Sequence, residues 1–217
     1  MRIIEPCCYH KQLEGMIDEC SKKHTAANFF SFSDWDMCDL LGTLSGYCSG
    51  GEMGIVMVRL DVKLIQTIRR ILSRVKPDPT NPSDHIADVS KMILISQPAS
   101  TGATFNQRQE IRTQLGEFIQ SGRLVVCEDN VGFRCVTVKS KSHSLVIQGS
   151  LNTQRSNAMQ MFTLTTSPEE YENVAEMFRM KEHTKSIFKQ QPFPYGHENG
   201  FVAKCKNKHV SMCLFLH

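Results

Sequence analysis

The chain has 217 residues, of which 41% are hydrophobic and 22% are charged, so its composition suits one ordinary folded domain and not a disordered chain. The formal net charge is only +3, from 25 basic and 22 acidic residues, which is too weak to require a nucleic-acid partner. The nine cysteines have no regular spacing, and the sequence contains neither a signal-peptide pattern nor an apolar run of roughly 18 residues. These features favour a reduced, cytoplasmic protein that does not enter a membrane.

Helices and strands are predicted to alternate through the first part of the chain. A helix is expected over residues 6–23, because Pro6 suits a first helical turn and apolar residues then recur at helical spacing. A strand is expected over residues 27–33. Asp34 is a suitable N-cap for a helix that runs to about Tyr47.

The alternation continues with a second strand and helix. The nearly continuous apolar run at 53–60 predicts a strand that is buried on both faces. Asp61 is expected to cap the next helix, which carries an apolar stripe. Three prolines mark a loop near 76–82. A third strand at 91–96 and a helix at 105–121 follow.

The second part of the chain is richer in strands. Four are expected without helices between them, at 123–128, 133–139, 143–148 and about 160–165. Ser167 then caps a last helix that runs to about Lys189. The element order predicts one α/β domain over 1–190, with a mixed, mostly parallel sheet flanked by helices on both faces. The tail at 191–217 has no clear period and is predicted to lie outside the core.

One short motif carries most of the functional information. Gly149-Ser150-Leu151-Asn152 directly follows the expected strand at 143–148, which forms a hairpin with the strand before it. A serine hydroxyl and an asparagine amide on one turn can both hydrogen-bond phosphate oxygens. This arrangement resembles the phospholipase D-like superfamily, whose motif is His-x-Lys, then Asp, then Gly-Ser-x-Asn at a characteristic spacing.

The chain departs from that family pattern where the chemistry occurs. In the family the His attacks phosphorus and the Lys neutralises the phosphate. The family spacing places Cys135 at the position of the His, Thr137 at that of the Lys and Ser142 at that of the Asp. A downstream Glu is common in the family, and Gln160 stands roughly at its position. A cysteine in an apolar strand has a raised pKa and is a poor nucleophile. The resemblance therefore implies a phospholipase D-like fold that is silent by the family mechanism. The positions that match the family site are Cys135, Thr137, Ser150, Asn152 and Gln160.

Three functional hypotheses follow. The first is a non-catalytic phospholipase D-like domain that binds a phosphate-containing ligand, nucleic acid or nucleotide, or a protein partner. The second is a divergent phosphodiesterase or nuclease that uses other residues. The third is a structural or inhibitory interaction protein, since family members with a single motif commonly form homodimers. The cations singled out for phosphate contact are Arg108, Arg112, Arg155 and Lys139. Lys139 and Lys141 are expected near the Gly-Ser-x-Asn turn.

The remaining histidines and cysteines are given structural interpretations. Cys205, His209 and Cys213 in the tail lack a fixed fourth ligand for zinc. Cys7 and Cys8 are assigned to an N-terminal helix. No metal and no cofactor are therefore predicted. His143 is expected on the surface of the hairpin turn beside Lys139, away from Ser150. Four cysteines in apolar contexts are expected in the core: Cys38, Cys48, Cys127 and Cys135.

Overall fold

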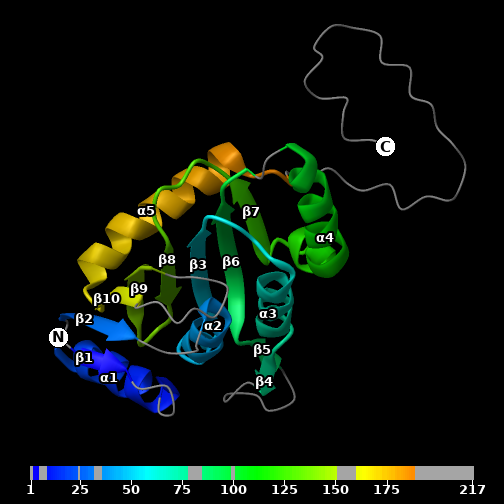
Figure 1. Cartoon of the computed structure of the whole chain (residues 1–217). Coiled ribbons are helices and arrows are strands. Elements are labelled where there is room, and N and C mark those ends of the chain that lie inside the picture. The colour runs from blue at the N-terminus through cyan, green and yellow to red at the C-terminus, as the bar shows by residue number, and fades with distance from the viewer. Residues whose placement is uncertain are drawn as a thin grey trace, which may run out of the picture.

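The structure is a computed structural model that describes residues 2–4, 9–23, 25–31, 36–77, 85–98, 101–150 and 160–188. Within these residues eight strands form one sheet in the order β1-β2-β10-β9-β8-β3-β6-β7 (Figure 1). The strands are β1 (Arg2–Ile4), β2 (Ala26–Ser31), β3 (Gly51–Met57), β6 (Val89–Ser96), β7 (Leu124–Glu128), β8 (Cys135–Lys139), β9 (Ser144–Gly149) and β10 (Gln160–Thr165).

The sheet mixes parallel and antiparallel pairs. Among the described strands, three neighbouring pairs are parallel, namely β1 with β2, β3 with β6 and β6 with β7. The other four pairs are antiparallel and involve β8, β9 and β10. Because β8 and β10 alone run against the common direction, six of these eight strands still have their carboxyl ends at one edge. The mixed sheet is confirmed, but its parallel character is only partial. The short β8–β9 turn permits only antiparallel pairing there.

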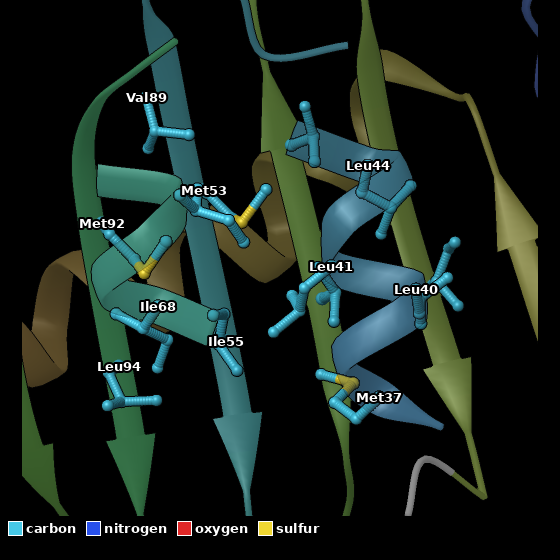
Figure 2. Close-up of a cluster of buried hydrophobic side chains, with 14 of the residues drawn as sticks. Met37, Leu40, Leu41, Leu44, Met53, Ile55, Ile68, Val89, Met92 and Leu94 are labelled. Carbon is cyan, nitrogen blue, oxygen red and sulfur yellow. The ribbon is translucent and has the colours of Figure 1, made fainter. Parts of the chain in front are cut away.

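Helices cover both faces of this sheet, as predicted (Figure 1). Buried side chains of four helices pack on one face: α1 (Tyr9–Lys23), α2 (Met37–Ser45), α3 (Val62–Leu72) and α4 (Thr101–Gln120). The other face is covered by α5 (Pro168–Lys185). Figure 2 shows Leu41 of α2 on the side that faces Met53 and Ile55 of β3, and Leu40 on the opposite side of the helix; all four belong to the larger core.

The central strands are buried on both sides, which accounts for their continuous apolar sequences. In β3, Ile55 belongs to the core beneath α1–α4, whereas Val56 belongs to the core beneath α5. In β6, Leu94 and Ile95 divide in the same way. Successive side chains of a strand point to opposite faces, so a strand between two helical layers must be apolar at every position.

Of the three predicted N-caps, two are found, whereas α2 is capped by a later residue than expected. Asp61 and Ser167 accept backbone N–H groups as the N-caps of α3 and α5. The N-cap of α2 is Asp36, whose side chain accepts from the backbone N–H groups of Cys38 and Asp39. Asp34, the predicted cap, lies outside the described residues. Asp39 also accepts the N–H of Asp36, and this reciprocal capping box selects Asp36.

Three short strands have no counterpart in the sequence analysis. These are β1, β4 (Val75–Pro77) and β5 (His85–Ala87), each three residues long. β4 and β5 pair with each other on either side of the predicted proline loop. Three residues are too few for a periodic pattern, so such strands are set by their partners. The tail at 191–217 lies outside the described residues.

Candidate functional site at the β8–β9 hairpin

The Gly149–Ser150 turn joins three strands at one edge of the sheet. The N–H of Gly149 donates to the carbonyl of Arg134 at 3.3 Å, and the N–H of Ser150 donates to the carbonyl of Met161 at 2.9 Å. Cys135, the first residue of β8, pairs with Gln148 of β9. Gln160 is the first residue of β10 and therefore lies at the same edge. The backbone thus gathers Cys135, Ser150 and Gln160 at the edge where β9 ends.

Gly149 is required by the close approach of β10. Its φ is +149°, and a Cβ atom there would lie 2.1 Å from the carbonyl oxygen of Met161 and 2.9 Å from the Cα of Phe162. No L-residue fits this geometry without displacing β10. Ser150, the next residue, is exposed to solvent. The glycine of the motif therefore has a structural role of its own, whereas the serine is available to a ligand.

The two positions that carry His and Lys in the family lie inside the core. Cys135 is fully buried and Thr137 is 3% exposed. A Cβ atom on Gly54 would lie 2.4 Å from Thr137 Oγ1 and 2.7 Å from Cζ of Phe178, so Thr137 lies beneath α5. Burial raises the pKa of the Cys135 thiol to about 12. Neither side chain presents a nucleophile or a cation to solvent.

The other motif positions are dispersed. Ser142 lies in the turn at the opposite end of the hairpin, where its Oγ is 2.8 Å from Nδ1 of His143. The six residues of β9 separate this turn from Ser150, which at about 3.3 Å per residue is roughly 20 Å. Asn152 and Arg155 lie outside the described residues.

The predicted cations are placed differently from the expectation. Lys139 and Lys141 were expected beside the Gly-Ser-x-Asn turn, but they lie at the other end of the hairpin, where Lys139 pairs with Ser144. Proximity in the sequence misled here, because the intervening strand β9 carries the chain across the sheet. His143 does lie at the turn near Lys139, as expected, since its carbonyl accepts the N–H of Ser140.

Two arginines have partners of their own. Arg108 makes a two-pronged ion pair with Glu128, in which Nε donates to Oε1 at 2.9 Å and Nη2 contacts Oε2. Arg112 lies over the ring of Phe188 at 5.3 Å. Arg134, whose carbonyl accepts the N–H of Gly149, carries no motif or local pattern in the sequence that would mark it. Hairpin register would have indicated it, because the residue before β8 must lie opposite the end of β9.

Within the described part of the chain, no group of three or more His, Cys, Asp or Glu side chains is arranged to hold a metal ion. The clusters considered in the sequence analysis fall largely elsewhere: Cys7, Cys8 and the tail residues lie outside the described ranges. His10 has its Nδ1 2.6 Å from Oγ1 of Thr43. None of the helices in the described residues is long and apolar enough to cross a membrane.

Comparisons with known proteins give structural similarity alone. No protein-family model matches the chain, and no curated protein matches it. Among solved structures, the chain is similar to the phospholipase D family member Nuc from Salmonella typhimurium, at 7% identity and a TM-score of 0.45, over 74% of this chain and 95% of that one. It is similar to NucT from Helicobacter pylori at 12% identity and a TM-score of 0.45, over 74% and 98%.

A third similarity is to TrmBL2, an archaeal chromatin protein whose structure shows a novel mode of DNA binding. The identity is 8% and the TM-score 0.45, over 81% of this chain. The chain spans 61% of the length of that protein.

Proposed function

We propose that this chain is a non-catalytic phospholipase D-like domain that binds a phosphate-containing ligand, a nucleic acid or a nucleotide, at the Gly149–Ser150 edge. One observation carries the proposal. The retained part of the motif lies at the surface, at Ser150, whereas the replaced part, at Cys135 and Thr137, lies in the core. A surface hydroxyl can hold a phosphate oxygen, but a buried neutral pair cannot attack phosphorus.

The chemistry of this edge favours binding over hydrolysis. The family reaction needs a nucleophile and a cation on the same phosphate. A thiol with a pKa of about 12 is almost entirely protonated at neutral pH, and Cys135 is in addition inaccessible to substrate. The Ser150 hydroxyl can donate one hydrogen bond to a phosphate, and Arg134 adds a cation next to the turn. Asn152 and Arg155 are the further contacts that the sequence motif suggests.

Fluorescence anisotropy with labelled single-stranded DNA and RNA, and calorimetry with nucleotides, test the proposal. Ser150→Ala removes a hydrogen bond to a charged group, worth about 1.5–3 kcal/mol, so affinity should fall by roughly tenfold or more. Arg134→Gln should weaken binding and reduce its salt dependence. Two exposed residues of the α3 region supply matched controls, Ser73→Ala and Arg70→Gln, and these should leave binding unchanged.

Two results would overturn the proposal. Absence of binding to every probe would remove the ligand. Hydrolysis of a probe that is abolished by Ser150→Ala would establish the divergent phosphodiesterase instead. Hydrolysis that survives Ser150→Ala would indicate a contaminating nuclease. Such hydrolysis should also be unchanged in Cys135→Ala, which alters a buried residue.

A further inference from the structure

A polar pocket of about 160 Å³ lies at the turn of the β8–β9 hairpin, at the opposite edge of the sheet from Ser150. Three basic side chains line it, those of Lys139, Lys141 and His143. Its other lining residues are serines of the hairpin and of α1, together with Thr166 and Pro168 where α5 begins. The lining therefore combines cations with hydroxyl groups and contains no carboxylate.

Lys139 is held in place by two contacts. Its ammonium lies 5.0 Å from the ring centroid of Tyr171, and it donates a hydrogen bond to Oγ of Ser144 at 2.8 Å. Glu52 is its cross-strand neighbour. The lysines that form ion pairs within 4.0 Å, among the described residues, are Lys23, Lys63, Lys91 and Lys181. An ammonium has three donors, so Lys139 keeps donors for an anion in the pocket.

The turn itself is ordered by its own hydrogen bonds. Ser140 Oγ accepts the N–H of His143 at 3.1 Å, and Ser142 Oγ lies 2.8 Å from Nδ1 of His143. The His143 ring packs edge-on against Tyr47, with centroids 5.1 Å apart. The His143 ring and the serine hydroxyls of the turn are thus positioned before any ligand arrives, which lowers the entropy cost of binding.

A second, independent observation comes from α1. Ser21 lines the pocket, and its Oγ is buried with no hydrogen-bond partner among the described residues. A buried hydroxyl that makes no hydrogen bond is rare in folded proteins and costs about 1–3 kcal/mol. This hydroxyl is closed to water in the ligand-free protein, so an oxyanion in the pocket would give it an acceptor once the Ser21 side chain rotates toward the pocket.

We propose that this pocket binds a phosphoryl group, as inorganic phosphate or as the terminal phosphate of a small molecule. Its charge and donors suit a dianion. Its volume is below the roughly 300–1,000 Å³ of ordinary ligand pockets, and it holds about five waters at ~30 Å³ each. One phosphoryl group therefore fits, while an attached nucleoside would lie outside. Because the pocket is at the other edge of the sheet, this inference does not depend on the function proposed for Ser150.

Amide NMR spectra of the full chain, titrated with sodium phosphate at constant ionic strength, test the inference. Saturable shifts are expected for the amides of residues 139–144 and for Ser21. Lys141→Gln changes an exposed side chain and should weaken phosphate binding at least about fivefold through loss of one charge-assisted contact. Lys139→Gln should act in the same direction. Lys11→Gln, an exposed lysine at the start of α1, is the matched control and should change nothing.

Ser21→Ala supplies a readout that a purely structural role would not produce. It should lower phosphate affinity while leaving the stability of the phosphate-free protein unchanged or raised, because it removes an unpartnered buried hydroxyl. Shifts that do not saturate, or that sodium chloride reproduces, would overturn the inference. Unchanged phosphate affinity in Lys141→Gln and Ser21→Ala would overturn it as well.

Two further arms separate the sources and the sites. If the shifts of residues 139–144 saturate at lower concentration with AMP than with inorganic phosphate, a terminal phosphate is the natural ligand of the pocket, whereas equal affinity at these residues would identify free phosphate. Ser150→Ala should leave the phosphate-dependent shifts of residues 139–144 unchanged, and Lys141→Gln should leave oligonucleotide binding unchanged. Failure of this pocket and failure of the Ser150 edge are therefore distinguishable in the same set of proteins.

Discussion

At Gly149 the need for glycine comes from the backbone of the next strand. We expect Gly149→Ala to lower the free energy of unfolding by at least about 2 kcal/mol, because the new Cβ would lie 2.1 Å from the carbonyl oxygen of Met161 at an unfavourable φ. Urea unfolding followed by circular dichroism measures the loss. Gly132→Ala is the control, since nothing lies within 4 Å of its added Cβ, and it should change stability by less than about 0.5 kcal/mol. Equal effects of the two substitutions would contradict this explanation.

Thr137 offers a test of whether the His and Lys of the phospholipase D-like motif can be introduced into this fold. We expect Thr137→Lys, alone or with Cys135→His, to destabilise the fold by more than about 3 kcal/mol, because position 137 is 3% exposed and an ammonium buried there would be unpaired. Thr137→Val keeps the shape, adds no charge and removes only the hydroxyl, so it should cost about 1 kcal/mol.

Thermal unfolding and hydrolysis of a chromogenic phosphodiester are the measurements for these variants. A stable double variant that hydrolyses the diester would show that side chains at positions 135 and 137 can reach substrate, and therefore that the core does not exclude it. The expected result is a destabilised protein without activity, since the two side chains point into the layer beneath α5.

At the scale of elements, the capping box of α2 fixes where that helix begins. The sequence suggested Asp34 as the N-cap, two residues before the observed N-cap, Asp36. Asp36 is fully buried, accepts two backbone N–H groups and makes an ion pair with Lys63. Asp36→Ala should cost about 2 kcal/mol or more, because the cap and a buried partner of Lys63 are lost together. Asp36→Asn keeps the cap and should cost less.

Chemical denaturation measures the free energy of unfolding of these two variants and of Asp39→Ala. The comparison separates the contribution of the Asp36 cap from that of the hydrogen bond that Asp39 returns. Asp39 returns only one hydrogen bond to Asp36, at 3.1 Å. We therefore expect the order of destabilisation to be Asp36→Ala, then Asp39→Ala. The reverse order would mean that the α2 start is not fixed by Asp36.

Most elements with a strong local pattern could be predicted from the sequence. The doubly buried strand β3, the cap Asp61 and the cap Ser167 are found where expected. The sheet order could not be predicted. β10 lies between β2 and β9, and this depends on pairing between residues more than a hundred positions apart, such as Phe162 with Phe29. No local propensity encodes that choice.

The same distinction between local pattern and tertiary packing applies to the candidate site. The sequence identified Ser150 and the neutral replacements at Cys135 and Thr137. Cys135 was expected in the core from its apolar context, and it is fully buried. The burial of Thr137 could not be predicted, because it depends on α5 packing over the hairpin. Lys139 and Lys141 were expected at the wrong end of the hairpin, because residues that are close in the sequence can lie at opposite ends of a strand.

At the scale of the whole molecule, four buried thiols link stability to pH. Burial raises the pKa of Cys38 to about 11 and those of Cys48, Cys127 and Cys135 to about 12, from an ordinary value of 9.0. Above pH 9 the unfolded chain loses these protons while the native protein keeps them. The native state then binds more protons, so the free energy of unfolding must fall as pH rises.

We expect stability to be level from pH 7 to about 8.5 and to fall steeply between about pH 9.5 and 11. Each thiol in this window contributes about 1.4 kcal/mol per pH unit, so four contribute roughly 5 kcal/mol per unit. That is a large share of the ~5–15 kcal/mol that stabilises a typical domain. Urea unfolding at a series of pH values, under a reducing agent, measures the slope.

Cys135→Ala isolates the contribution of one thiol to the pH dependence, because burial alone raises the pKa of Cys135. The variant should lose some stability at pH 7 from the missing sulfur, yet its slope above pH 9.5 should be smaller than that of the unsubstituted chain by about 1.4 kcal/mol per unit. An exposed side chain changed elsewhere, as in Lys11→Gln, should leave the slope as it is. Identical slopes for Cys135→Ala and the unsubstituted chain would mean that this thiol ionises in the native state, and hence that α5 does not close over position 135 as the structure has it.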